Sequence, residues 1–342
     1  MKKIKWITSL SMLLFVSLFI QGCTNSEAKK KVEESKNSLL PILYDKEADK
    51  KSETASRIDA KLNKQYTKET WSYKSKELTL ANDILPREND LIVSDSKGDR
   101  LVILDYNGKI LKTVGKTGSG PLEFSNPTGV TSYKDKIYII DGMNDRIQIL
   151  DKEFKYIKEI KLPRDEENPE FPFRDIEIDK DGTIYLSGGQ VDNPGILYYE
   201  NDNADYKWIR ENFEGYMAEI DGEIYAINRG IFYTSKDNEE WGIRSGENYL
   251  LKVNKSGLEK VCELPFGITS NDFTINNNKE IVSVSGGYYQ LLRMNMKVEY
   301  IDSIGEVNLD KSTFAYINID KNGTYYFTDG ASGNIYLIKK GN

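Results

Sequence analysis

Short apolar segments separated by polar turns recur along most of this chain. Six of them share one pattern, a core rich in Ile, Val and Tyr that ends at Asp, Asn, Gly or Ser. These are DLIVSD (90–95), KIYIID (136–141), TIYLSG (183–188), EIYAIN (223–228), EIVSVS (280–285) and TYYFTD (324–329). Their starting residues lie 46, 47, 40, 57 and 44 residues apart. A β-rich repeat of this period is typical of a propeller with one copy per blade. The pattern predicts an all-β fold, a six-bladed β-propeller with four-stranded blades.

The second repeat shows a whole blade most clearly. Period-two alternation predicts strands at 129–132, 137–140, 146–150 and 156–162, with polar or glycine-containing turns between them. The first and last blades follow the same pattern. Their strands are expected at 91–94, 101–104, 110–114, 315–319, 324–328 and 334–338.

The last blade has only three strands before the chain ends. The segment 71–80 (WSYKSKELTL) resembles a strand and belongs to no blade. We expect it to pair with the last blade and so close the ring, because closure removes an open edge that would invite aggregation. The propeller is expected to span residues 66–342.

Residues 113–150 carry a motif with a Gly-rich turn, Gly-Pro-x-x-Phe, Pro-x-Gly-Val, an Ile-Tyr-x-x-Asp strand and Asn-x-Arg-Ile-Gln. This segment resembles an NHL repeat, a family whose fold is the six-bladed propeller. Members of that family mostly bind proteins, nucleic acids or glycans, and a few related propellers are enzymes, so the resemblance implies a fold and no single function. Its elements here are Gly118, Gly120, Pro121, Phe124, Pro127, Gly129, Val130, Ile137, Tyr138, Asp141, Asn144, Arg146, Ile147 and Gln148.

The first 22 residues have the layout of a secretory signal. Three lysines precede the apolar stretch 7–20, which is short for a spanning helix, and Cys23 follows Gly22. This arrangement resembles a bacterial lipoprotein signal, in which the cysteine is lipid-modified and becomes the new N-terminus. We therefore expect residues 1–22 to be a signal peptide and Cys23 to carry a lipid such as palmitate, which anchors the protein at the extracytoplasmic face of the cell membrane. The alternative is an ordinary signal peptide with an incidental cysteine.

Residues 23–65 are rich in Lys, Glu, Ser, Asn and Ala. Such a composition buries too little apolar surface to offset the entropy of ordering, so we expect a flexible charged tether. Net charge is −7, from 47 basic and 54 acidic side chains. No long basic stripe follows from that balance, so no nucleic-acid partner is expected.

The chain contains no histidine. Catalytic triads, metal ligands and general bases that depend on histidine are therefore excluded. Two segments, 179–183 (DKDGT) and 320–324 (DKNGT), resemble the opening of a calcium-binding loop. Both lie between the first and second strands of a blade, where Asp-Gly and Asn-Gly favour hairpin turns. We interpret them as hairpins.

Candidate ligand-binding residues are those expected near one mouth of the channel, on loops between the second and third strands or loops that cross to the next blade. They are Arg100, Arg146, Arg174, Arg229, Asn271 and Tyr288. Arg146 also has a structural alternative, a pair with Asp141 across its turn. The 57-residue interval of the fourth blade adds Trp241, which would suit a peptide or a sugar ring if it is exposed.

Two hypotheses for function remain open. The first is a non-enzymatic, lipid-anchored module that binds a peptide, protein or glycan at the propeller mouth and needs no cofactor. The second is a Ca²⁺-dependent hydrolase or lactonase of the six-bladed type, which would hold the cation with oxygen ligands. Asp175, Glu177 and Asp272 are the nearest carboxylate candidates, but alternation does not say whether their side chains face the channel. A third possibility is a scaffold subunit of a secretion or envelope complex, which the sequence does not distinguish from the first hypothesis.

Overall fold

The computed structural model describes residues 62–164, 173–188, 195–200, 205–209, 213, 215–228, 231–234, 241–244, 249–264, 270–285, 290–306, 315–330 and 332–341. For residues 231–234, 241–244, 270–271 and 285 the description covers the backbone only. Contacts divide the chain into two units, Met1–Glu53 and Thr54–Asn342. All the described residues belong to the second unit.

The first three blades are antiparallel sheets of four strands. Blade 1 contains β2 (Ala81–Pro86), β3 (Leu91–Asp95), β4 (Arg100–Leu104) and β5 (Ile110–Val114). Between blades 1 and 2 lie the short parallel strands β6 (Lys116–Thr117) and β7 (Glu123–Phe124). Blade 2 contains β8 (Pro127–Tyr133), β9 (Lys136–Asp141), the 3₁₀ turn η1 (Gly142–Asn144), β10 (Arg146–Asp151) and β11 (Tyr156–Lys161). Blade 3 contains β12 (Phe173–Ile178), β13 (Ile184–Gly188), β14 (Ile196–Tyr199) and β15 (Tyr206–Ile209).

The other three blades have the same antiparallel arrangement. Blade 4 contains β16 (Gly215–Ile220), β17 (Glu223–Asn228), β20 (Tyr249–Asn254) and β21 (Gly257–Glu263), with the inserted hairpin β18 (Ile231–Thr234) and β19 (Trp241–Arg244). Blade 5 contains β22 (Ser270–Ile275), β23 (Glu280–Ser285), β24 (Gln290–Asn295) and β25 (Ile301–Glu306). Blade 6 contains β26 (Tyr316–Ile319), β27 (Tyr325–Thr328), β28 (Asn334–Lys340) and β1 (Tyr66–Ser72).

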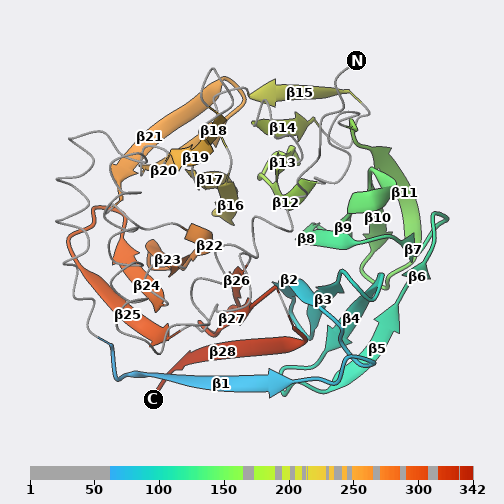
Figure 1. Cartoon of the computed structure of the whole chain (residues 1–342), viewed down its shortest axis with the longest axis horizontal. Coiled ribbons are helices and arrows are strands. Elements are labelled where there is room, and N and C mark those ends of the chain that lie inside the picture. The colour runs from blue at the N-terminus through green and yellow to red at the C-terminus, as the bar shows by residue number, and fades with distance from the viewer. Residues whose placement is uncertain are drawn as a thin grey trace, which may run out of the picture. The chain divides into compact units, whose positions relative to one another are not determined.

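The blades form a closed ring around a central channel (Figure 1). The first strand of each blade is innermost, and each innermost strand contacts the innermost strands of both neighbouring blades. These six strands are β2, β8, β12, β16, β22 and β26. The fold class predicted from the repeat is therefore confirmed.

The apolar core lies between the blades. Each buried cluster takes side chains from two neighbouring sheets, because a twisted sheet with two apolar faces must cover both of them. Phe124 is an example, since it is fully buried among Ile92 and Leu101 of blade 1 and Ile139 of blade 2. It fills the space between these two blades.

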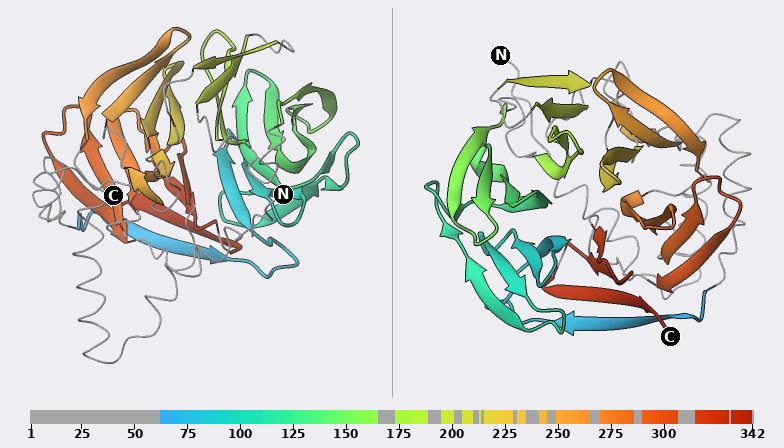
Figure 2. Two further views of the ribbon diagram at one scale, coloured as in Figure 1. Left: turned by 45° about the horizontal axis from the view of Figure 1, so that its top comes forward. Right: turned by 180° about the vertical axis from the view of Figure 1, so that it is seen from behind.

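An N-terminal strand closes the ring, as predicted. Strand β1 pairs antiparallel with β28 over its whole length, from Tyr66↔Lys340 to Ser72↔Asn334, and Figure 2 shows the two strands side by side in the view from behind. The predicted bounds of 71–80 were wrong, because β1 ends at Ser72. The chain turns at 74–77 and then buries Leu78 in the core between blades 6 and 1.

The preceding residues fasten the closing strand to blade 5 as well. Leu62 forms a parallel bridge with Ser303, and the Asn63 amide donates a 2.8 Å hydrogen bond to Asp302. The Tyr66 hydroxyl accepts a 3.1 Å hydrogen bond from Arg293. Residues 62–66 therefore join blade 5 to blade 6 at the rim of the propeller.

The two Asp-rich segments are hairpin turns. Asp179 Oδ1 accepts hydrogen bonds from the backbone N–H groups of Asp181 and Thr183, and Asp320 Oδ1 does the same with Asn322 and Thr324. The glycine that follows each turn has a positive φ, +85° at position 182 and +82° at position 323, as such hairpins require. Within the described part of the chain, no helix has the length and apolar character needed to cross a bilayer.

Candidate channel site

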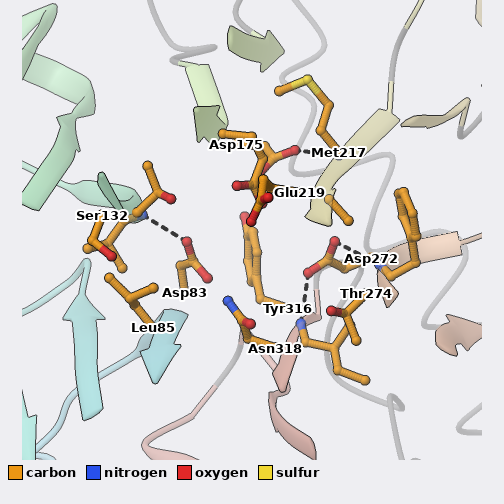
Figure 3. A pocket seen from close by; sticks show the side chains of 16 residues that line it. Asp83, Leu85, Ser132, Asp175, Met217, Glu219, Asp272, Thr274, Tyr316 and Asn318 are labelled. Atoms are coloured by element: carbon orange, nitrogen blue, oxygen red, sulfur yellow. Dashed lines mark hydrogen bonds between the residues drawn. The ribbon is translucent and has the colours of Figure 1, made fainter. Parts of the chain in front are cut away.

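Three innermost strands carry an aspartate next to a change of register. The register shifts between Ala81 and Ile84 in β2, between Phe173 and Asp175 in β12, and around Asp272 in β22. A β-bulge inserts an extra residue and re-aims the side chains beside it. Here it accompanies three aspartates, Asp83, Asp175 and Asp272, that face the channel (Figure 3).

Each of these aspartates also links its blade to the next one. Asp83 accepts a 2.8 Å hydrogen bond from the backbone N–H of Val130 in blade 2. In the same way, Asp175 accepts a 2.6 Å bond from Met217. Asp272 accepts a 2.7 Å bond from Ile317. Blades 1, 3 and 5 thus supply carboxylates, and blades 2, 4 and 6 supply the donors.

Side chains from all six innermost strands enclose a cavity of about 150 Å³ in the channel (Figure 3). Because one water molecule occupies about 30 Å³ of the liquid, the cavity holds several waters or one small polar group. Among the described residues, sixteen line the cavity, of which five are acidic and none is Lys or Arg. The acidic residues are Asp83, Asp175, Glu177, Glu219 and Asp272. The cavity is therefore a concentrated negative site.

Burial raises the pKa of these carboxyl groups. Desolvation raises the pKa of Asp83 to about 6, against the opposing effect of the N–H bonds from Val130 and Ile84. Desolvation, with the charge of Asp83, raises the pKa of Asp175 to about 7. Glu177 and Asp272 have pKa values well above the usual range, first because of desolvation and then because of Asp175. These carboxyl groups therefore do not all ionise together unless a positive charge is bound beside them.

Several buried hydroxyl groups that line the cavity have no hydrogen-bond partner among the described residues. The Tyr316 side chain is 3% exposed, Thr274 6% and Thr131 8%. The ring of Tyr316 is held edge-on against Tyr216, with 5.9 Å between centroids and 89° between planes. A buried polar group without a partner costs free energy, so these hydroxyls require water or a ligand.

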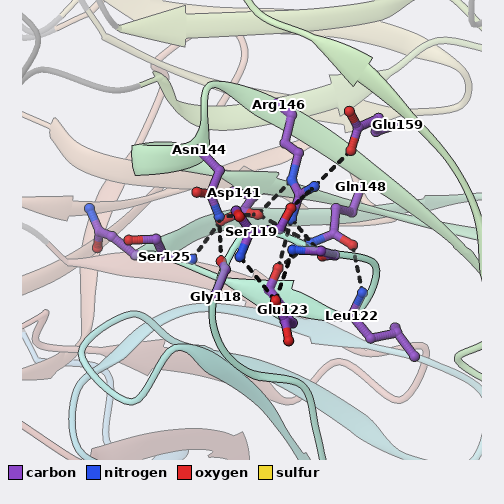
Figure 4. Close-up of polar contacts among 12 residues, drawn as sticks. Gly118, Ser119, Leu122, Glu123, Ser125, Asp141, Asn144, Arg146, Gln148 and Glu159 are labelled. Atoms are coloured by element: carbon purple, nitrogen blue, oxygen red, sulfur yellow. Dashed lines mark hydrogen bonds and ion pairs between the residues drawn. The ribbon is translucent and has the colours of Figure 1, made fainter.

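Arg146, a predicted ligand residue, lies at the centre of a hydrogen-bond network in blade 2 (Figure 4). Its side chain is 3% exposed, and it pairs with Asp141 at 2.8 Å and with Glu159 at 2.7 Å. The pair across the turn, the structural alternative, is therefore present. The guanidinium also donates to the carbonyl groups of Ser119, Gly120 and Glu123. Arg146 fixes the loop that crosses from blade 1.

Arg100 has the equivalent position in blade 1. It pairs with Asp95 at 3.0 Å and donates to the carbonyl groups of Lys76 and Glu77. Asp95 in turn accepts the backbone N–H of Thr79. Both arginines hold the crossing loops of their blades, and a role for either in ligand binding stays a prediction.

The other predicted residues are only partly described. Arg174 lies on β12 directly before Asp175, and Asn271 lies on β22 directly before Asp272. Trp241 begins β19 in the inserted hairpin, and its side chain is outside the described residues. The residues outside the description altogether are Cys23, Arg229 and Tyr288. Of the predicted ligand-binding residues whose side chains are described, Arg100, Arg146 and Arg174, none is among the sixteen residues that line the cavity.

The sequence analysis left open which face Asp175, Glu177 and Asp272 occupy, and it missed Asp83 and Tyr316. A signal for the aspartates does exist. The segments Asn-Asp-Ile (82–84), Arg-Asp-Ile (174–176) and Asn-Asp-Phe (271–273) repeat in alternate blades. Tyr316 has no comparable signal, because its position depends on the packing of Tyr216.

The arrangement of carboxylates differs from that of a closed metal cage. Among the described residues, no group of three or more Asp, Glu or Cys side chains converges closely enough to hold a metal ion. A bare Ca²⁺ takes six to eight oxygens at about 2.3–2.6 Å, which needs close convergence. The five described carboxylates instead surround the channel on four strands, with Asp175 and Glu177 together on β12.

Comparisons with solved structures agree with the fold. Virginiamycin B lyase from Staphylococcus aureus is 13% identical over 80% of this chain and 99% of that chain, with a TM-score of 0.53. A luciferin-regenerating enzyme is 9% identical over 81% and 98% of the two chains, with a TM-score of 0.54. A calcium structure of a Trichoderma reesei family AA12 carbohydrate-active enzyme is 10% identical over 82% and 97%, with a TM-score of 0.53. These identities establish a shared fold alone.

A search of curated protein sequences finds no match to this chain. The sequence does match the DUF5128 family, described as a 6-bladed beta-propeller, over residues 73–269, more than half of the chain. The chain therefore belongs to the DUF5128 family of six-bladed β-propellers.

Proposed function

We propose that this protein is a binding module, lipid-anchored at the extracytoplasmic face of a bacterial membrane, that recognises a peptide, protein or glycan at the mouth of its channel. The observation that carries the proposal is the channel cavity, which all six blades line and in which buried hydroxyls have no hydrogen-bond partner among the described residues. A pre-formed cavity with a few convergent polar groups is the usual form of a ligand site.

Two further features support binding rather than a purely structural role. The motif of blade 2 resembles the NHL repeat, a family whose members mostly bind macromolecules. The hairpin of β18 and β19 is an insertion in blade 4, and insertions on a rigid scaffold often carry function. Trp241 begins β19, so the proposed site combines this hairpin with the channel mouth.

Crosslinking in intact cells tests the binding site. A photo-crosslinking residue at position 241 of the full-length protein should capture a specific partner. In the same background, Arg174→Ala should abolish capture while the unfolding midpoint stays nearly unchanged. Capture that is unaffected by Arg174→Ala would contradict the placement of the site at the channel mouth.

The lipid anchor rests on the sequence of residues 1–23. Cells that express the full-length protein should incorporate radioactive palmitate into it and retain it in the membrane fraction. Cys23→Ala should remove both the label and the membrane association. Unchanged labelling of the Cys23→Ala variant would contradict the anchor.

A Ca²⁺-dependent hydrolase or lactonase is the second candidate. The observation that favours it is that Asp175, Glu177 and Asp272 do line the channel cavity. Enzymes also occur among the proteins of similar structure, including the lyase and the luciferin-regenerating enzyme. Thermal unfolding of the full-length protein in EDTA and then in Ca²⁺ separates the candidates, since a bound ion stabilises the folded state by mass action. A rise of several degrees in Ca²⁺ would favour the hydrolase.

A further inference from the structure

We propose that the channel cavity receives the primary ammonium group of its ligand, such as the end of a lysine side chain. This rests on the proposed function, in which the ligand is bound at the channel mouth. Four features of the cavity favour an ammonium group: its charge, its hydroxyl groups that have no partner among the described residues, its size and the spread of its carboxylates.

The described residues that line the cavity include five acidic residues and no Lys or Arg. The positive charge of Arg174, which is outside this lining, acts on Tyr316. Glu177 makes no hydrogen bond or ion pair with the described residues, and Asp175 and Asp83 are its nearest charged neighbours. Carboxylates confined in a channel interact more strongly than exposed ones, because solvent and salt screen them less. A cation that enters the cavity is therefore favoured.

The buried hydroxyls are an independent observation that a ligand is needed. Tyr316, Thr131 and Thr274 line the cavity, are more than nine-tenths buried and have no partner among the described residues. Their oxygens can accept hydrogen bonds, as the carboxylates do. An ammonium group has three donors and no acceptor, so it matches a cavity of acceptors.

Shape favours an ammonium over the other common cations. The described carboxylates are spread over four strands around the channel, and among the described residues no three of them converge as the close cage of a bare metal ion requires. A guanidinium is planar and prefers two parallel bonds to one carboxylate. An ammonium is a compact point charge on a narrow stem, so it can enter a cavity of about 150 Å³ and donate in three directions.

The test is calorimetric titration of the full-length protein in detergent at pH 8 with Nα-acetyl-lysine amide. The neutral isostere Nα-acetyl-norleucine amide and CaCl₂ are titrated separately. We expect the lysine amide to bind with a Kd on the order of 1 mM and the norleucine amide to show no binding. Binding of both amides, or of neither, would overturn the proposal. Ca²⁺ binding that is tighter and excludes the lysine amide would overturn it in favour of a metal site.

Variants identify the cavity as the place of binding. Glu177→Gln should weaken lysine amide binding about tenfold, and Tyr316→Phe a few-fold, because each removes one acceptor. Glu299→Gln, the same change at an exposed position of blade 5, should leave the affinity unchanged. Equal affinity in Glu177→Gln and in the unchanged protein would overturn the proposal. If cells still yield a crosslinked partner in that case, the proposed function survives and only the inference about charge fails.

Discussion

The carboxylate of Asp83 in blade 1 accepts a 2.8 Å hydrogen bond from the backbone N–H of Val130 in blade 2. The equivalent bonds of Asp175 and Asp272 repeat this relationship around the ring in alternate blades. One group thus has two tasks, because it joins neighbouring blades and also places a negative charge in the channel. The backbone donors partly offset the cost of burying the charge, but they do not neutralise it.

Replacing Asp175 with Asn should stabilise the protein at high pH. The folded-state pKa of Asp175 is raised to about 7, whereas an unfolded aspartate titrates near 4. The folded protein therefore binds more protons between about pH 4 and pH 7, so this group's contribution to stability falls as the pH rises through 7. Asn keeps an oxygen for the N–H of Met217. We expect a gain of about 1–2 kcal/mol in the free energy of unfolding at pH 8 and none at pH 4.

Urea unfolding at both pH values measures this difference. Asp135→Asn is the control, since that side chain is 84% exposed and should show no effect at either pH. A loss of stability in Asp175→Asn at pH 8 would contradict the desolvation of this carboxyl group.

Arg146→Met should destabilise blade 2 strongly. The change leaves Asp141 buried without its counter-charge and frees three loop carbonyl groups. Breaking a buried pair in this way costs about 3–5 kcal/mol. Denaturant unfolding measures the cost, and Arg164→Met, at an ion pair that is half exposed, should change stability by less than about 1 kcal/mol. Similar effects of the two substitutions would show that the Arg146 network is not structural.

Ser94→Ala tests the contacts between blades 1 and 2. The Ser94 hydroxyl donates a 2.6 Å hydrogen bond to the Thr128 carbonyl and accepts a 2.9 Å bond from the Asp83 N–H. Alanine leaves both backbone groups without this partner, which should cost about 1–3 kcal/mol. Thermal unfolding checks this, with Ser256→Ala, in the exposed turn between β20 and β21, as a control that should be neutral. An unchanged midpoint in Ser94→Ala would mean that water replaces the hydroxyl.

Removal of the closing strand should expose an edge. A variant that begins at Tyr73 lacks β1, so β28 keeps only β27 as a partner and becomes an edge strand, while a variant that begins at Leu62 keeps β1. We expect the shorter protein to self-associate and to unfold at a lower temperature, because open strand edges pair with other chains. Sedimentation velocity compares the two variants. Two monomeric proteins of equal stability would contradict the role assigned to β1.

The blades could be predicted from sequence because their strands are both apolar and periodic. The predicted and observed strands of blade 2 differ by no more than two residues at either end. Strand β1 is different, since only Tyr66 and Trp71 of its seven residues are not exposed. Its signal in the sequence is weak, and the stronger alternation after Trp71 belongs to a turn and a core residue.

The channel site could be predicted only in part. Asp175 and Asp272 were recognised as candidates, but their direction depends on a register shift that alternation alone does not reveal. Arg100 and Arg146 were predicted as ligand-binding residues because they belong to the repeat motif. The same motif places Asp95 and Asp141 where they form ion pairs with these arginines. The cavity is lined by six strands that are distant in sequence. Its lining residues can therefore be identified only once the arrangement of the blades in the ring is known.

The most direct test of the account is a pH titration of the full-length protein in which the channel carboxyl groups are monitored by ¹³C NMR. We predict that Asp83 titrates near pH 6 and Asp175 near pH 7 in the absence of ligand. Addition of the lysine amide should lower both values, because a nearby positive charge favours the ionised form. Carboxyl groups that all titrate near pH 4, with no response to the lysine amide, would contradict the central claim that the channel is a desolvated acidic site.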